Sequence, residues 1–237
     1  MFVNTSQRTL ASEIMDDLQM EGEALRNTLD QIARINQLLG GNNITLEGVS
    51  MLMEDVAPGK EVTIADIGCG NGDMLRAVAK MAGKNGWRIK LVGVDANEYT
   101  VNYASTLSAQ YPEITYYCMD ILGEKFRELQ YDIVLCTLTL HHFEDRQIIK
   151  LLSLFRRNAT IGIVVNDLHR SALAYRLFQL FSRLTAMGAM AKEDGLVSIL
   201  RGFKRKEIQE LSRKLNFKQY TLRWKWAFRY QWIITNV

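Results

Sequence analysis

Proline, cysteine and histidine are scarce in this 237-residue sequence, which contains two, three and three of them respectively. No apolar run approaches the roughly 18 residues that a membrane-spanning helix needs, so we expect neither a transmembrane segment nor a secretory signal. The cysteines are odd in number and lack C-x-x-C spacing, and the histidines show no ligand spacing either, so we expect no disulfide framework and no metal site. The composition indicates a cytoplasmic protein with three free, buried thiols at Cys69, Cys118 and Cys136.

Three glycines, in contrast, stand at alternate positions within residues 68–72. Residues 62–73 read Val-Thr-Ile-Ala-Asp-Ile-Gly-Cys-Gly-Asn-Gly-Asp, and a helical apolar pattern follows. This order predicts a strand, a tight glycine loop and a helix, an arrangement that binds the polar parts of nucleotide-like cofactors. The dinucleotide spacing fails because Asp73 occupies the position of its last glycine, and no P-loop Gly-Lys-Ser/Thr is present.

Strand and helix patterns alternate from residue 61 onward, which indicates an α/β protein with a doubly wound, mostly parallel sheet of seven strands. The last two strands are joined by a short turn and predict a C-terminal antiparallel hairpin. The predicted strands are 62–67, 89–95, 114–118, 131–137, 160–166, 218–226 and 229–235. The predicted helices between them are 73–83, 99–110, 145–157, 173–184 and 204–215.

The best domain boundary is Pro58-Gly59. Apolar residues recur at helical spacing in residues 22–39, and a second short helix reads through residues 49–53. We expect residues 1–58 to form a helical cap on a main domain of residues 59–237, although an ordinary packing helix fits residues 49–53 as well. A helical insertion is expected at about 171–192.

Acidic residues end two further predicted strands. Asp95 stands 23 positions beyond Gly72 and can accept hydrogen bonds from both hydroxyls of a ribose. Asp120 ends the next strand. Each could instead cap a helix, but together with the glycine loop they predict a nucleoside-binding edge of the sheet.

The run Asp-x-Gly-x-Gly-x-Gly at residues 66–72 resembles the glycine-rich motif of class I S-adenosylmethionine-dependent methyltransferases, which share a Rossmann-like sheet with a terminal hairpin. Residues 34–41, 165–171 and 194–203 are similar to bacterial small-molecule methyltransferases, including the group associated with type III polyketide pathways and, more distantly, quinone-biosynthesis enzymes. The resemblance implies S-adenosylmethionine as cofactor, with S-adenosylhomocysteine as product. The cofactor contacts expected from it are Asp66, Gly68, Gly70, Gly72, Asp95, Ala96, Met119, Asp120, Ile121 and Thr137.

All three histidines follow the fourth or fifth strand, whose ends open at the edge where ligands bind. We hypothesise that His142 or His169 is a general base that removes a proton from the acceptor, with Asp167 orienting it. His141 is a further catalytic candidate. A structural role remains the alternative for any single histidine.

The acceptor is expected to be a small, hydrophobic or aromatic molecule. No Asn/Asp-Pro-Pro-Tyr/Phe run follows the fourth strand, which argues against methylation of amino groups on adenine or glutamine. Methylation of a phenolic or polyketide-like hydroxyl is preferred, and carbon methylation of a quinone-type ring comes second.

The charge distribution leaves RNA open as a third possible acceptor. Residues 201–229 carry ten basic and two acidic side chains, which could suit RNA, although such charges are more often a solvated face. A cofactor-binding module without catalysis is a weaker alternative. Both monomer and homodimer remain open.

Overall fold

The computed structural model describes residues 3–185 and 187–235. Residues 1–2, 186 and 236–237, which belong to the predicted cap, insertion and main domain, lie outside the described residues.

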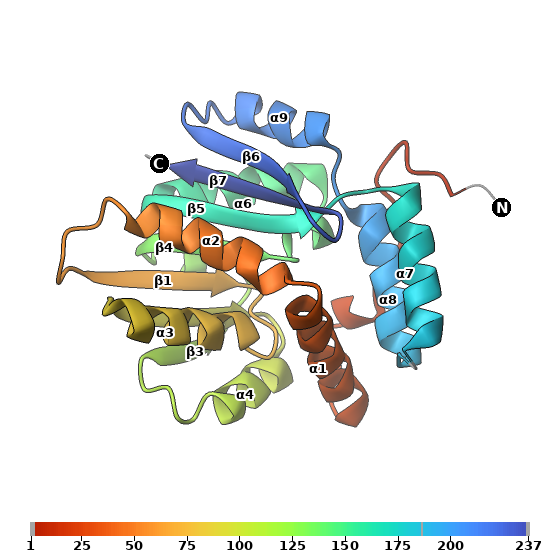
Figure 1. Cartoon of the computed structure of the whole chain (residues 1–237), viewed down its shortest axis with the longest axis horizontal. Helices are drawn as coiled ribbons and strands as arrows, with labels where there is room; N and C mark the ends of the chain where they lie inside the picture. Colours follow the sequence, from red (N-terminus) through yellow and green to blue (C-terminus); the bar gives the residue numbers. More distant parts are fainter. Residues whose placement is uncertain (1–2, 186, 236–237) are drawn as a thin grey trace.

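The described chain forms a seven-stranded sheet with the order β3-β2-β1-β4-β5-β7-β6 (Figure 1). Strands β1 to β5 are parallel to one another, and β7 runs antiparallel to both β5 and β6. The predicted α/β class, doubly wound sheet and terminal hairpin are therefore confirmed. The strands are β1 (Glu61–Ile67), β2 (Arg88–Asp95), β3 (Ile114–Cys118), β4 (Tyr131–Thr137), β5 (Ala159–Leu168), β6 (Tyr220–Lys225) and β7 (Arg229–Thr235).

Helices cover both faces of this sheet. Helices α2 and α3 share one apolar cluster, and α6 and α9 contribute to the other, while α4 packs against β2 and β3. The helices are α1 (Glu23–Leu38), α2 (Gly41–Met53), α3 (Asp73–Asn85), α4 (Glu98–Leu107), α5 (Glu124–Arg127), α6 (Asp145–Asn158), α7 (Ala172–Leu184), α8 (Ala189–Arg201) and α9 (Arg205–Lys214), with short 3-10 turns η1 (Ile14–Asp16) and η2 (Leu140–His142).

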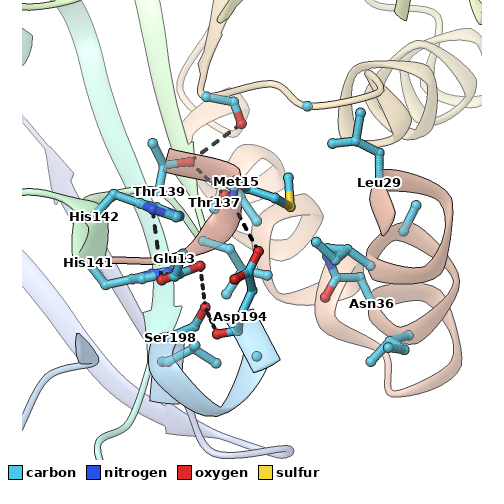
Figure 2. Close-up of a pocket in the computed structure, with 18 of the residues that line it drawn as sticks. Glu13, Met15, Leu29, Asn36, Thr137, Thr139, His141, His142, Asp194 and Ser198 are labelled. Carbon is cyan, nitrogen blue, oxygen red and sulfur yellow. Dashed lines mark hydrogen bonds and ion pairs between the residues drawn. The ribbon is translucent and has the colours of Figure 1, made fainter. Parts of the chain in front are cut away.

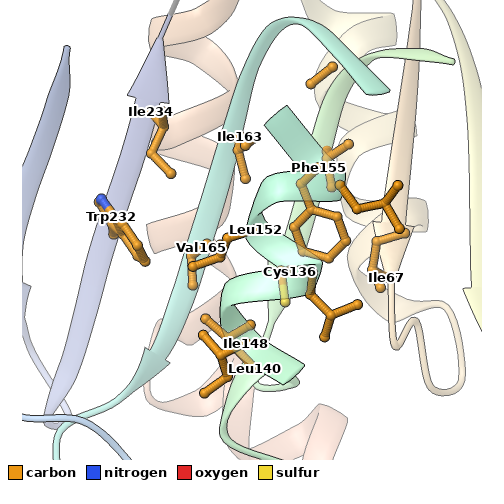
Figure 3. Packing of buried hydrophobic residues seen from close by; sticks show 14 of the residues in the cluster. Ile67, Cys136, Leu140, Ile148, Leu152, Phe155, Ile163, Val165, Trp232 and Ile234 are labelled. Carbon is orange, nitrogen blue, oxygen red and sulfur yellow. The ribbon is translucent and has the colours of Figure 1, made fainter. Parts of the chain in front are cut away.

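Strand β4 illustrates why the central strands are apolar throughout. Successive side chains of a strand point to opposite faces. Ile133 and Leu135 pack in the cluster with α2 and α3, while Val134 and Cys136 pack in the cluster with α6. Figure 3 shows Cys136 in the second of these clusters, beside Ile148 and Leu152 of α6. Both clusters exclude water from β4, so a polar residue on either face would be buried.

The cysteine prediction is correct for two positions and wrong for one. Cys69 and Cys136 are buried free thiols, whereas Cys118 is exposed. The reason is that Cys118 ends β3, an edge strand of the sheet, where side chains are only partly covered.

The segment before residue 58 contains two different parts. Helix α2 lies on the sheet face against β5 and β7, as the packing helix that the sequence left as the alternative for residues 49–53 (Figure 1). Gly48 makes this approach possible, because a Cβ there would lie 2.6 Å from Val164 Cγ1. Helix α1 and the mostly irregular residues 3–22 lie instead beside the carboxyl edge of the strands. The division of the chain at residue 58 stays a prediction.

Helices α7 and α8 follow β5 and pack against each other, and the insertion at about 171–192 stays a prediction. The second of them extends beyond the predicted limit of 192, to Arg201. The apolar side chains of α7 have two environments: Phe178 and Phe181 line a cavity, whereas Leu180 and Leu184 are exposed. Among the described residues, no helix combines the length and the apolar character that crossing a bilayer requires.

Candidate active site

A cavity of about 760 Å³ lies at the carboxyl edge of the sheet. Strands β1 and β4 are adjacent here. From β1 the sheet continues to β2 and β3 on one side, and from β4 it continues to β5 on the other. Doubly wound sheets bind ligands at this switch in strand order. The wall combines the loop after β1 with the ends of β2 and β4, with α1, α7 and α8, and with η1. Segments from both ends of the chain therefore meet at this edge.

The glycine loop takes a backbone conformation that favours glycine at three alternate positions. Gly68, Gly70 and Gly72 have φ values of 71°, 52° and 76°. A Cβ on Gly68 would also lie 2.4 Å from the side chain of Thr139, so no side chain fits there. The loop consequently presents bare backbone at the cavity wall, where a ligand can approach it closely.

Asp95, at the end of β2, is tied to this loop. Its Oδ2 accepts a hydrogen bond from the Gly70 N–H at 3.1 Å, and its Oδ1 accepts one from the Asn97 N–H at 3.1 Å. Burial raises the pKa of Asp95, while backbone N–H groups of Asn97, Gly70 and Ala96 oppose the rise. The carboxylate is thus held in a fixed orientation at the cavity wall, as binding of a ribose diol requires.

Asp66 offers a polar group that no protein atom satisfies. The residue is 2% exposed and lines the cavity, and its Oδ1 has no hydrogen-bond partner in the described part of the chain. Burial, and then the nearby charges of Asp73 and Asp95, raise the pKa of Asp66 well above its usual value. A buried polar atom without a partner is costly, so this carboxyl fits a ligand that carries a hydrogen-bonding or cationic group, such as the methionine part of S-adenosylmethionine.

The cavity brings most of the expected cofactor residues together. Those that line it are Asp66, Gly68, Gly70, Asp95, Ala96, Asp120, Ile121 and Thr137. Gly72 and Met119 are not part of the lining. Gly72 ends the loop under Tyr116, whose hydroxyl oxygen would lie 2.0 Å from a Cβ there, and the Met119 side chain packs against the apolar cluster of α6. Gly72 and Met119 therefore pack beneath the cavity wall and do not line the cavity.

His141 is enclosed between two carboxylates. Its Nδ1 lies 2.7 Å from Asp167 Oδ1, and its Nε2 lies 3.5 Å from Glu13 Oε1. Burial works to lower the pKa of His141, but the charges of Asp167 and Glu13 and the hydrogen bond to Asp167 outweigh it and raise the pKa to about 9. His141 is therefore a protonated, buried residue at neutral pH and is unsuited to accept a proton from an acceptor.

His142 lies beside it on the cavity wall, with a side chain that is 29% exposed. Its Nδ1 lies 2.7 Å from Asp16 Oδ1, and Arg201 Nη1 donates to Asp16 Oδ2 at 2.6 Å. Burial works to raise the pKa of Asp16, but the hydrogen bonds from His142 and Arg201 hold it well below its usual range. Because this carboxylate accepts hydrogen bonds only, it places the proton on Nδ1 and leaves the Nε2 lone pair available.

His169 reaches the same cavity from the end of β5 but has different partners. The Trp224 Nε1–H donates to His169 Nδ1 at 3.2 Å, and the ring stacks on Phe228. Burial, followed by the charges of Lys204 and Arg170, lowers the pKa of His169. With Nδ1 acting as acceptor, Nε2 carries the proton, so His169 is set to donate rather than to accept.

The sequence did not predict a role for Glu13 and Asp16, the two acidic residues that contact His141 and His142 at the cavity. Figure 2 shows Glu13 between the two histidines and Ser198, whose hydroxyl donates to Glu13 Oε2 at 2.7 Å. Asp194 fixes the turn that carries both acids, because it accepts the backbone N–H groups of residues 14 and 15. Asp167, expected to orient the catalytic base, contacts His141 instead.

Donor atoms of Glu13, His141 and His142 lie within 4.8 Å of one another, as in some metal sites. However, Arg201 Nη1 stands 3.6 Å from Glu13 Oε1, which places a fixed cation beside the only carboxylate of this group. The expectation of no metal stays a prediction.

Comparisons with known proteins agree with this geometry. Residues 64–162 match a family model described as a methyltransferase domain. No curated protein is significantly similar to the chain in sequence. Among solved structures, the plantazolicin methyltransferase BpumL in complex with SAH superposes with a TM-score of 0.68 at 17% identity, over 88% of this chain and 89% of that one.

Two further structures are similar. The DszA carbon methyltransferase has a TM-score of 0.67 at 14% identity, and the match covers 88% of this chain but 58% of that chain. The magnesium protoporphyrin IX methyltransferase ChlM from Synechocystis PCC 6803, with bound SAH, has a TM-score of 0.54 at 17% identity, over 84% and 85% of the two chains. Residues 64–162 therefore match a methyltransferase domain, and the chain shares the fold of these solved methyltransferases.

Proposed function

We propose that the chain transfers a methyl group to the hydroxyl of a small phenolic or polyketide-like acceptor, with His142 as the general base. The observation that carries this proposal is the position of His142: its Nδ1 is held by Asp16, and its other edge lies on the wall of a mostly apolar cavity.

The cofactor half of the cavity lies along β1, β2 and β3. Asp66, Asp95 and Asp120 would hold the methionine, ribose and adenine parts respectively, against the bare backbone of the loop at 68–72. S-adenosylmethionine supplies a methyl group that is already activated by its sulfonium. The protein then chiefly aligns donor and acceptor, and such positioning can contribute roughly 7–11 kcal/mol.

The acceptor half is bounded by apolar side chains. Ile32 of α1, Phe178 and Phe181 of α7, and Phe143 belong to its lining. The volume of about 760 Å³ suits a small organic ligand beside the cofactor. Apolar walls of this kind favour a hydrophobic or aromatic acceptor over a charged polymer.

The basic charge of residues 201–229 is paired in part. Arg201 pairs with Asp16 at 2.6 Å. Glu47 contacts both Arg223 and Lys225 on β6. These ion pairs neutralise part of the excess that the sequence suggested, and the apolar wall of the cavity supports a small molecule over RNA.

His142 would supply the chemistry that a phenol lacks. A phenol has a pKa near 10 and is mostly protonated at neutral pH, so it is a poor nucleophile. A neutral imidazole within hydrogen-bond reach can remove the proton as the methyl group is transferred, for roughly 10²- to 10⁴-fold in rate. Asp16 orients the ring and stabilises the positive charge that develops on it.

The similar structures include enzymes described both as carbon methyltransferases and as an O-methyltransferase family protein, the latter from Burkholderia thailandensis. Other names among them refer to plantazolicin and magnesium protoporphyrin IX. These names support a small-molecule acceptor for this chain and leave the choice between oxygen and carbon to experiment.

The test is a methyl-transfer assay with a panel of hydroxylated aromatic acceptors and S-adenosylmethionine carrying a deuterated methyl group. Mass spectrometry detects the product, and NMR separates a methoxy group from a methyl group on carbon. We expect His142→Gln to slow single-turnover transfer by roughly 10²- to 10⁴-fold with unchanged affinity for S-adenosylhomocysteine, and His169→Gln to retain most activity. Full activity of His142→Gln, or label found only on carbon, would contradict the proposal.

A further inference from the structure

Helix α7 presents a face of leucines to the outside of the molecule. Its opposite side packs on α8, where Gly195 makes room for Phe178, and Figure 1 shows the two helices together at one end of the molecule. The leucines recur at intervals of four, three and four residues, so they share one side of the helix. They form the leucine face, which consists of Leu173, Leu177, Leu180 and Leu184, each between 48% and 77% exposed. Four large apolar side chains on one exposed helix face indicate an interaction surface, which a single exposed leucine would not.

The leucine face continues into the opening of the cavity. Three side chains line the cavity and are also 48–71% exposed, which places them at its opening: Leu18, Leu177 and Trp226. They come from the segment between η1 and α1, from α7 and from the turn between β6 and β7. The opening therefore has an apolar rim, and Leu177 belongs to both this rim and the leucine face.

The charge around the leucine face is positive. Arg176 and Arg183 are exposed residues of the same helix. Residues 168–192, which include all of α7, contain no aspartate or glutamate. Leucines and arginines on an exposed helix without acidic residues are typical of helices that lie on a membrane containing anionic lipids.

The same charges disfavour a second copy of the chain as the partner of the leucine face. A two-fold contact centred on this face would bring α7 against α7, with the arginines of both copies and no acidic side chain of either helix, so the charges would repel. Trp226 at the rim fits a lipid surface, since tryptophan is enriched where proteins meet the headgroup region. A bilayer also lets a hydrophobic acceptor pass from lipid into the apolar cavity without crossing water.

We propose that the leucine face of α7 docks on an anionic phospholipid bilayer, with the rim of the cavity turned toward the lipid. The leucines enter the boundary between headgroups and acyl chains, while Arg176 and Arg183 contact lipid phosphates. This docking places the opening of the cavity at the compartment where a hydrophobic acceptor accumulates. The docking goes beyond the proposed methyl transfer and does not depend on it.

The test is co-sedimentation of the full chain with phospholipid vesicles. We expect about 10- to 30-fold tighter binding to vesicles with equal parts of phosphatidylglycerol and phosphatidylcholine than to pure phosphatidylcholine, because each arginine near an anionic surface contributes about fivefold. The combined variant Leu173→Gln, Leu180→Gln and Leu184→Gln should weaken this binding more than about 10-fold. Its unfolding midpoint and its affinity for S-adenosylhomocysteine should not change, because these three side chains are exposed and do not line the cavity. Leu107→Gln is the matched control and should bind like the wild type, since Leu107 lies on α4 at the β3 edge of the sheet.

Two further measurements keep the leucines in place, so they decide even if the combined variant unfolds early. Arg183→Gln should lose about fivefold in binding to the anionic vesicles and nothing in binding to pure phosphatidylcholine. Brominated lipids should quench the tryptophan fluorescence of the vesicle-bound wild type, and they should quench Trp226→Phe less, because Trp226 stands at the rim.

Equal vesicle binding by the wild type and a folded combined variant would overturn the proposal, as would equal quenching of the wild type and Trp226→Phe. A wild type that does not bind vesicles would overturn it as well. In that case, a dimer in sedimentation velocity that the combined variant dissociates would assign the leucine face to a second copy, and a monomer would assign it to a different protein. His142→Gln tests methyl transfer separately, because vesicle binding needs no turnover.

Discussion

His141 should make the stability of this protein fall as the pH rises above neutrality. Its ring is buried between Asp167, at 2.7 Å, and Glu13, at 3.5 Å. Protonated His141 neutralises part of this negative charge. When it loses its proton, the two carboxylates, which both have lowered pKa values, face a neutral ring.

The magnitude follows from the pKa of His141, which rises from 6.5 to about 9 on folding. At about 1.4 kcal/mol for each pKa unit, this corresponds to about 3 kcal/mol of folding free energy. Because the folded-state pKa lies above the unfolded value, the contribution is complete below about pH 6.5 and is lost as the pH rises through about 9. The carboxylates act in the opposite direction, since their lowered pKa values stabilise the fold above the unfolded values and lose effect in acid.

The perturbation is His141→Asn, because its amide can still donate to Asp167 from the position of Nδ1 but cannot titrate. Urea unfolding at about pH 6.5 and about pH 9.5 should show a loss of about 3 kcal/mol for the wild type, and a much smaller loss for His141→Asn. His169→Asn is the control, because the pKa of His169 is lowered and its titration falls below this pH window. Equal losses in the wild type and His141→Asn would refute the assignment of a raised pKa to His141.

Three further predictions concern the cofactor half and the thiols. Gly68→Ala should lower the free energy of unfolding by about 2–4 kcal/mol in urea titrations, because it combines backbone strain with a 2.4 Å clash. The control Gly59→Ala has φ of 80° and no neighbour within 4 Å, so it should show the loss from strain alone. Equal losses in the two variants would contradict the clash at Gly68. Asp95→Asn should weaken S-adenosylhomocysteine binding roughly 10- to 100-fold by calorimetry, and unchanged affinity would remove Asp95 from the ribose site. A thiol reagent followed by mass spectrometry should modify Cys118 alone in the folded protein and all three cysteines after denaturation, and labelling of Cys69 or Cys136 before unfolding would contradict their burial.

The sheet could be predicted because its signals are local. Each central strand is a short apolar run bounded by turn residues, as in 131–137, and the crossover rules then limit the possible orders. Helix α8 was less visible, since Gly195 interrupts its pattern. That glycine has a packing reason: a Cβ there would lie 2.4 Å from Phe178 Cζ, so it allows α8 to approach α7. This contact between two helices produces no apolar periodicity, so it could not be predicted from the sequence.

The cofactor residues of the site could be predicted from local signals, whereas the acidic residues beside the histidines could not. The cofactor residues follow strand ends, and their spacing along the chain reveals them. Glu13 and Asp16 lie in an irregular segment without apolar periodicity, among nine acidic residues in positions 1–60. Asp16 reaches Arg201 across 185 residues of sequence, and no local pattern encodes such a contact.

His141 and His142 show how neighbouring residues of one type acquire different chemistry. Both belong to the turn η2, and their ring centroids are 4.3 Å apart. His141 is closed in by carboxylates on both nitrogens, so its proton is bound tightly and its role is structural. His142 has a carboxylate on one nitrogen and the cavity beside it, which is the arrangement a general base needs. Both histidines follow the end of β4, and the contacts from Glu13 and Asp16 distinguish the proposed base, His142, from the buried ion pair of His141.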